Sequence, residues 1–178
     1  MSKPTLARAD DSTLVLIDIQ ERLAGVMPAR ESIVRSAGIL LEAAGRLGIP
    51  VVATEQYPQG LGPTVAELTA KLPADGKRIE KTSFSACAAL PLTRPQVILA
   101  GMEAHVCVLQ TALELAAAGR EVFVVADAVC SRTEANRSNA LARLQAAGVT
   151  VTNTESVLFE WLRDAGHEHF RTISKLIR

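Results

Sequence analysis

The sequence predicts an α/β protein in which a parallel β-sheet carries helices on both faces. Short apolar runs rich in β-branched residues alternate with longer stretches of helical period, the pattern of successive βα units. The 178 residues suit one domain, so we expect a single domain over residues 1–178. Hydrophobic residues make up 48% and charged residues 21% of the chain, a balance typical of a globular protein rather than a disordered one.

Six short apolar segments are expected to be the strands of this sheet. They cover residues 14–19, 50–54, 78–80, 96–101, 121–127 and 149–153, and the pattern is weakest at 78–80.

Helical periodicity follows most of these strands. The expected helices cover residues 29–48, 105–119 and 133–148, each closed by a glycine, and a final helical region from about 155 to the end. A short helix is also expected at 64–71, inside the loop-rich segment 56–77. In 105–119 the spacing predicts one buried stripe, about 100° away from Cys107, made of Val106, Leu109, Leu113 and Ala116.

Charge and composition exclude several classes of protein. Nineteen basic residues balance nineteen acidic ones without a long block of one sign, which argues against nucleic-acid binding and a polybasic membrane patch. The N-terminal segment lacks the apolar core of a signal peptide, and no apolar run approaches the roughly 18 residues of a membrane span. Neither GxGxxG nor GxxxxGK[ST] is present. We therefore expect a cytoplasmic protein that binds a small molecule.

Three reactive side chains fall at or after the carboxyl ends of expected strands, where α/β sheets bind ligands. Asp18 closes the first strand, Lys81 follows the third, and Cys107 lies one turn after the fourth. Each has an ordinary structural alternative: a turn aspartate, a solvated lysine and a buried, inert cysteine. Together they have a chemical logic, because a helix N-terminus and a nearby ammonium lower the pKa of a thiol. A carboxylate in reach can then move the proton to and from a leaving amine.

The other cysteines and the histidines are weaker candidates. The chain has Cys87, Cys107 and Cys130, an odd number without CxxC spacing, so we expect free thiols rather than disulfides or a zinc site. Cys130 follows a strand and is the stronger rival nucleophile. No histidine makes a convincing base for Cys107, because His105 is only two residues away on a helix and His167 and His169 lie in the C-terminal region.

The segments "LVLIDIQERL", "EKTSFSA" and "GMEAHVCVLQTALEL" resemble the Asp, Lys and Cys motifs of the isochorismatase-like cysteine hydrolase superfamily. The similarity includes "VVATEQYPQGLGPTVAEL", "VFVVADAVCSR" and "TESVLFEWL", spans nearly the whole chain, and is greatest to the isochorismatase domain-containing subgroup. The resemblance implies a Rossmann-like three-layer α/β/α sandwich with a six-stranded parallel sheet in order 3-2-1-4-5-6.

The resemblance also implies site roles. Cys107 would be the nucleophile, Asp18 the base and Lys81 the cation that tunes both. A cis peptide would join Met102 and Glu103, and the backbone N–H groups of Glu103 and Cys107 would form an oxyanion hole.

Two departures limit this transfer. Nicotinamidases of the superfamily bind a metal through a DxH pattern after the second strand, where this chain has "TEQYP", so neither a metal nor another cofactor is expected. Isochorismatases of siderophore pathways cleave a vinyl ether and lack the cysteine, so Cys107 favours cleavage of an amide-like bond. The residues expected to contact substrate are Gln20, Glu55, Gln56, Tyr57, Phe84 and His105.

The leading hypothesis is a metal-independent hydrolase that cleaves a C–N bond of a small molecule through a Cys107 thioester. The alternatives are vinyl ether hydrolysis of the isochorismatase type and a non-catalytic role in assembly or binding. Members of the superfamily are commonly homo-oligomers, so we expect self-association, with the C-terminal helices as the candidate interface.

Overall fold

The computed structural model describes residues 5–178, so the first four residues of the expected domain lie outside the described residues. Its strands are β1 (Ser12–Ile17), β2 (Val51–Gln56), β3 (Lys77–Lys81), β4 (Gln96–Met102), β5 (Glu121–Cys130) and β6 (Thr150–Thr152). Its α-helices are α1 (Glu21–Ala24), α2 (Arg30–Arg46), α3 (Pro58–Leu61), α4 (Ala66–Thr69), α5 (Leu109–Ala117), α6 (Glu134–Ala146), α7 (Thr154–Leu162) and α8 (Phe170–Ile173). Short 3₁₀ turns cover Ala9–Asp11 and Cys87–Ala89, and one π-helical turn covers Ala104–Val108.

The strands form one sheet in the order β3-β2-β1-β4-β5-β6, and every neighbouring pair is parallel. The predicted topology is therefore confirmed. The order reverses between β1 and β4, whose carboxyl ends are adjacent because Ile17 pairs with Gly101. Parallel pairing also brings the ends of β2 and β3 to the same edge, since Gln56 pairs with Lys81.

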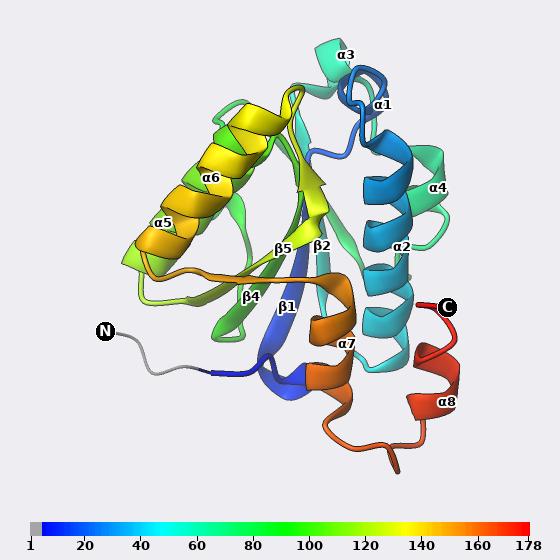
Figure 1. Ribbon diagram of the computed structural model, residues 1–178. Coiled ribbons are helices and arrows are strands. Elements are labelled where there is room, and N and C mark those ends of the chain that lie inside the picture. Colours follow the sequence, from blue (N-terminus) through cyan, green and yellow to red (C-terminus); the bar gives the residue numbers. More distant parts are fainter. Residues whose placement is uncertain (1–4) are drawn as a thin grey trace.

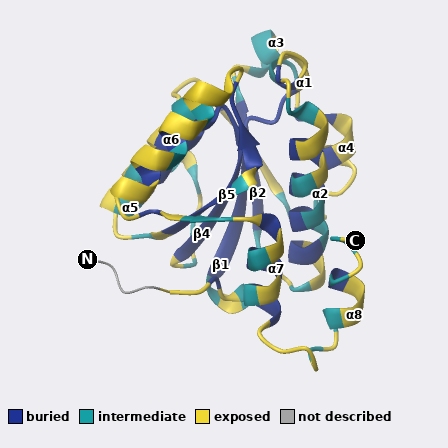
Figure 2. Cartoon of the chain, in the orientation of Figure 1, coloured by how far each residue is buried: buried dark blue, intermediate teal, exposed yellow. Residues whose placement is uncertain are grey.

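Helices cover both faces of this sheet (Figure 1). The apolar layer on one face joins the sheet to α2, α4, α7 and α8, and the layer on the other face joins it to α5 and α6. All of β1 is buried, and its side chains alternate between the two layers, with Leu14 and Leu16 in one and Val15 and Ile17 in the other. Figure 2 shows the central strands buried and the outer faces of the helices exposed. This double burial explains why the strands are continuous apolar runs rather than alternating ones.

The predicted buried stripe of the fifth helix is wrong in most of its members. Only Leu109 of the four stripe residues is buried, while Val106, Leu113 and Ala116 are partly exposed. The buried side is instead made of Cys107, Val108, Leu109, Thr111, Ala112 and Leu115. Within α5 the buried side is centred near Ala112 rather than Leu113, so Leu113 and Ala116 lie at its edge. The π-helical turn before α5 changes the angular position of Val106 alone among the four, because its hydrogen-bond spacing is wider than that of an α-helix.

None of the helices in residues 5–178 is both long enough and apolar enough to cross a lipid bilayer.

Candidate active site

A buried ion pair joins the ends of β1 and β3. Asp18 is the first residue after β1, is fully buried, and its Oδ2 lies 2.8 Å from Lys81 Nζ. The backbone at Asp18 is left-handed, with φ of 53°, which turns the chain out of the strand toward Gln20. Thr54, at the end of β2, donates its hydroxyl to Asp18 Oδ1 at 2.7 Å. Both carboxylate oxygens therefore have a fixed partner.

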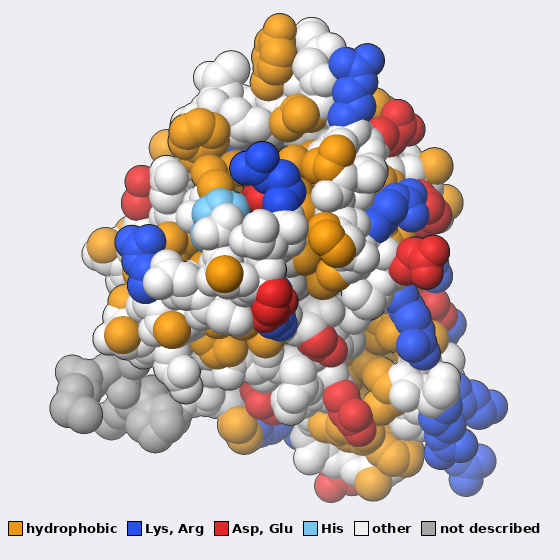
Figure 3. All heavy atoms as spheres, turned by 45° about the horizontal axis from the view of Figure 1, so that its top comes forward, with side chains coloured by type: hydrophobic (Ala, Val, Ile, Leu, Met, Phe, Trp, Pro, Cys, Tyr) orange, Lys and Arg blue, Asp and Glu red, His pale blue; other side chains and the backbone are white. Residues whose placement is uncertain are grey.

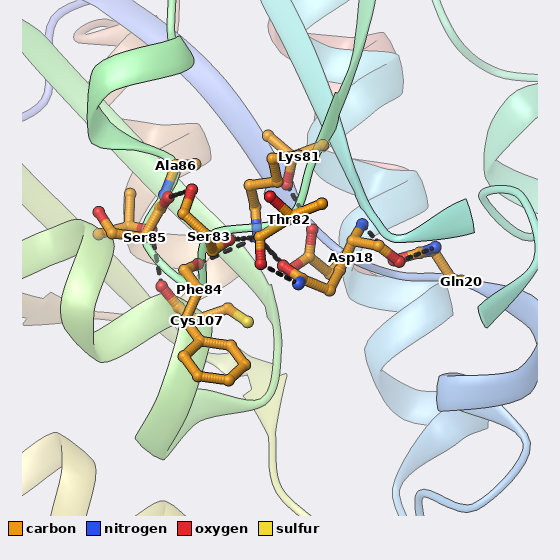
Figure 4. Close-up of polar contacts among 12 residues, drawn as sticks. Asp18, Gln20, Lys81, Thr82, Ser83, Phe84, Ser85, Ala86 and Cys107 are labelled. Atoms are coloured by element: carbon orange, nitrogen blue, oxygen red, sulfur yellow. Dashed lines mark hydrogen bonds and ion pairs between the residues drawn. The ribbon is translucent and has the colours of Figure 1, made fainter. Parts of the chain in front are cut away.

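Lys81 is anchored by four oxygen atoms. Besides Asp18, its Nζ contacts Gln56 Oε1 at 2.7 Å and the backbone oxygens of Ser83 and Phe84 at 3.0 Å each. The expected alternative of a solvated lysine does not hold, because only 3% of the Lys81 side chain is exposed. Figure 4 shows Lys81 reaching from β3 between Asp18 and the loop that carries Ser83 and Phe84.

Cys107 lies in the π-helical turn between β4 and α5, and it is 5% exposed. Burial, which is the largest cause, and the negative charge of Asp18 together raise the pKa of the Cys107 thiol to about 12. The Lys81 ammonium acts in the opposite direction but is outweighed. The expected lowering of the pKa is therefore wrong, because burial and the charge of a carboxylate outweigh the ammonium. At neutral pH Cys107 is a thiol.

The turn before Cys107 carries a second cluster of charged side chains. The Met102–Glu103 peptide bond is cis. Glu103 is largely buried, and its Oε2 accepts hydrogen bonds from Arg132 N and Nε, both at 3.2 Å. His105 Nδ1 lies 2.9 Å from Ser131 Oγ and 3.9 Å from Glu103 Oε2. Charged side chains and a histidine gather on the molecular face that Figure 3 brings forward, where the strands end.

The six residues expected to contact substrate fall into two groups. Gln20 and Glu55 are buried and hold loops instead: Gln20 bonds the backbone of Gln56 and Gly62, and Glu55 Oε1 accepts from Thr64 N and Oγ1, both at 2.8 Å. The remaining side chains reach the surface or lie near it, and they are Gln56, Tyr57, Phe84 and His105.

A hollow of about 360 Å³ adjoins Lys81 on its outer side. It lies between α3 and the end of β3, and its lining residues are Tyr57, Pro58, Gln59, Glu80, Lys81 and Thr82. Of Asp18, Lys81 and Cys107, Lys81 alone lines this hollow.

Two residues of the site were not found from the sequence. Thr54 holds Asp18, and the fully buried Thr111 donates to the backbone oxygen of Cys107 at 2.6 Å and accepts from Ala86 N at 2.9 Å. Each is a hydroxyl in an apolar stretch, which is the sequence signal that could have identified it.

A family model described as the isochorismatase domain matches residues 12–156, which include all of these side chains. This chain belongs to the isochorismatase domain family. Isochorismatase domain-containing protein 2 of Bos taurus is 41% identical over 185 residues, covering 99% of this chain and 89% of that protein. The secreted isochorismatase effector Isc1 of Phytophthora sojae is 40% identical, covering 94% of this chain and 84% of that protein.

Solved structures of this hydrolase family share the fold over nearly the whole chain. The MAR1 ribonuclease of Caenorhabditis elegans has a TM-score of 0.93 and 37% identity, covering 97% of this chain and 92% of that one. The YcaC gene product of Escherichia coli, an octameric hydrolase of unknown specificity, has a TM-score of 0.88 and 26% identity, covering 99% and 91%. YcaC of Pseudomonas aeruginosa, solved with hexane-2,5-diol and covalent acrylamide, has a TM-score of 0.86 and 25% identity, covering 99% and 98%.

The rival thiols of this isochorismatase domain lie in less suitable places. Cys130, at the end of β5, is 1% exposed, and burial followed by the charge of Glu103 raises its pKa to about 12. Cys87 is partly exposed, and burial and Glu114 raise its pKa. Neither Asp18 nor Lys81 is among the charged groups that shift the pKa of these two thiols, in contrast to Cys107.

The part of the chain that the structure describes contains no group of three or more His, Cys, Asp or Glu side chains placed to hold a metal ion. His167 and His169 have ring centroids 5.7 Å apart and lie between α7 and α8, at the amino end of α8 and away from the strand ends.

Proposed function

We propose that this protein is a metal-independent cysteine hydrolase that cleaves a C–N bond of a small amide-like molecule through a thioester on Cys107. The single observation that carries the proposal is the buried ion pair of Asp18 and Lys81, 2.8 Å long, whose two charges both act on the buried Cys107 thiol. Asp18 and Cys107 follow the two strands between which the order of the sheet reverses, the usual place for an α/β active site.

The proposed reaction has two halves that share one proton carrier. Asp18 takes the thiol proton as the sulfur attacks the carbonyl carbon, and the N–H groups of Glu103 and Cys107 stabilise the oxyanion. Asp18 then gives that proton to the leaving amine as the C–N bond breaks, which leaves a thioester. In the second half Asp18 takes a proton from water as the water oxygen attacks the thioester carbon. The carbon–sulfur bond then breaks, the carboxylic acid product leaves, and Asp18 returns the proton to the Cys107 sulfur.

The raised pKa of Cys107 suits this order of events. A thiol that stays protonated at rest needs its base only when the substrate carbonyl is in place, and the negative sulfur then passes its charge to the oxyanion. Lys81 lies 2.8 Å from Asp18, so the carboxylate that carries the proton has a counter-charge beside it. The covalent acrylamide in the Pseudomonas relative supports a nucleophile in this family fold.

Vinyl ether hydrolysis is the second candidate, and the name of the Phytophthora relative favours it. In that reaction Asp18 would donate a proton to the substrate, and Cys107 would be dispensable. A role in assembly or binding is the third candidate. The octameric Escherichia coli relative supports self-association of this chain, and the zero net charge argues against RNA as a substrate despite the name of the nematode relative.

Intact-protein mass spectrometry tests these candidates directly. The protein is incubated with a panel of small amides, with isochorismate and with a short RNA, and both adducts and products are measured. We expect an acyl adduct on Cys107 from at least one amide, which disappears in Cys107→Ala and persists in the control Cys87→Ala. Turnover that survives Cys107→Ala would contradict the thioester route. Turnover of isochorismate but of no amide, or of RNA but of no amide, would contradict the proposed amide substrate.

A further inference from the structure

The loop that follows Lys81 is fastened to the nucleophile's helix. We call residues 82–86 the lysine strap. At one end, the backbone oxygens of Ser83 and Phe84 accept hydrogen bonds from Lys81 Nζ, both at 3.0 Å. Within the strap, Ser83 Oγ donates to the backbone oxygen of Ser85 at 2.8 Å. Figure 4 shows the strap between Lys81 and Cys107.

Two anchors connect the other end of the strap to the helical segment that contains Cys107. The buried anchor is Thr111 Oγ1, which accepts a hydrogen bond from Ala86 N at 2.9 Å. The exposed anchor is Glu114, whose Oε2 accepts from Ser85 Oγ at 2.6 Å. Buried hydrogen bonds are costly to break because the orphaned groups lose water as well as their partner, whereas solvent replaces an exposed one.

The Thr111 hydroxyl also has a defined direction. Its single proton is donated to the Cys107 backbone oxygen at 2.6 Å, so its lone pairs are free for the Ala86 N–H. One fully buried oxygen thus bridges the backbone of the strap and the backbone of the candidate nucleophile. The bridge continues through the strap carbonyls to the Lys81 ammonium, and from there to Asp18.

We infer that Thr111 is a positioning residue, which sets the register of the lysine strap against Cys107 and thereby fixes the Lys81 ammonium and the exposed Phe84 ring relative to the sulfur. The inference rests on the proposed function only in taking Cys107 as the nucleophile. Two of the four oxygens around Lys81 Nζ belong to the strap, so a shifted strap leaves the ammonium held by Gln56 and Asp18 alone.

Substitutions at Thr111 separate the effect of its hydroxyl group from the effect of its side-chain shape. Thr111→Val keeps the volume and removes both hydrogen bonds, whereas Thr111→Ser keeps the hydroxyl and removes only a methyl group. Thr111→Ala also lacks the hydroxyl and repeats the test should the valine variant not fold. Ser85→Ala is the matched control, because it cuts the exposed anchor and leaves the buried one intact.

The readout is the ratio of the alkylation rates of Cys107 by iodoacetate and by iodoacetamide, located by peptide mass spectrometry. The two reagents are similar in size, so a change in access to the sulfur affects both rates equally and cancels in the ratio. Iodoacetate is an anion and iodoacetamide is neutral, so the ratio reports the positive charge near the sulfur. Displacing the ammonium by about 2 Å at an effective dielectric constant near 20 is expected to lower the ratio about threefold to fivefold.

We expect this fall in Thr111→Val, and in Thr111→Ala, with wild-type ratios in Thr111→Ser and Ser85→Ala. A merely structural role lowers the melting temperature of Thr111→Val but leaves its ratio unchanged, and that result overturns the inference. A fall in Thr111→Ser as large as in Thr111→Val overturns it as well. Failure of the amide panel to label wild-type Cys107 would instead count against the proposed function, because alkylation needs no hydrolysable substrate.

Discussion

Replacing Lys81 by methionine removes the only positive charge that contacts Asp18 among the described residues and keeps the length of the side chain. Asp18 is fully buried, so the carboxylate left behind has only the Thr54 hydroxyl as a fixed side-chain partner. Breaking a buried ion pair from one side costs about 3–5 kcal/mol, whereas losing an exposed pair costs about 0–1 kcal/mol. The burial of both partners places this pair in the first class.

The assay is urea unfolding followed by circular dichroism at pH 7. We expect the free energy of unfolding of Lys81→Met to fall by about 3–5 kcal/mol. The double variant Asp18→Asn/Lys81→Met should recover much of that loss, because it leaves no unpaired charge. Lys71→Met is the matched control: Lys71 is about half exposed and pairs with Glu42 at 3.5 Å, so its loss should stay below about 1 kcal/mol.

A loss of about 1 kcal/mol or less for Lys81→Met at pH 7 would refute the buried-pair reasoning.

Two further predictions concern the thiol and the closest approach of two strands. Because the pKa of Cys107 is about 12, its alkylation rate by iodoacetamide should rise tenfold per pH unit through pH 10. Asp18→Asn should increase this rate at pH 8, because it removes a negative charge that raises the pKa. A wild-type rate that reaches a plateau near pH 8 would contradict the raised pKa. Gly101→Ala should abolish soluble folded protein, because φ at Gly101 is 141° and an added Cβ would overlap the Ile17 backbone. The control is Gly45→Ala, where an added Cβ meets no atom within 4 Å beyond its neighbours in the helix, so the melting temperature should stay the same or rise. Equal melting temperatures for the two alanine variants would show that the strands can separate at Gly101.

The convergence of Asp18 and Lys81 was predictable because parallel strands end at one edge of a sheet, so the order of apolar runs places their followers together. Even the weak run at 78–80 becomes a strand, β3, through pairing with β2. The order of the strands came from the resemblance to a family rather than from periodicity. The position of a residue can be predicted from the sequence where it follows from the direction of the strands alone.

The sign of the Cys107 pKa shift was not predictable, because it depends on how burial, one carboxylate and one ammonium balance at specific distances. Gln20 and Glu55 were expected at the substrate, but their side chains turn inward to backbone groups of a distant loop. Thr111 was missed because its two partners come from different segments of the chain. Each of these outcomes is a property of contacts, which the periodicity of the chain does not encode.

The ion pair of Asp18 and Lys81 ties together strand ends that are far apart in the chain, whatever chemistry takes place beside it. Loss of either residue alone leaves one buried charge without its partner, whereas replacement of both together removes the charge. Asp18 and Lys81 are therefore expected to be kept or lost as a pair for stability alone. Their presence in a relative is then weaker evidence of enzymatic activity than the presence of a cysteine at the position of Cys107.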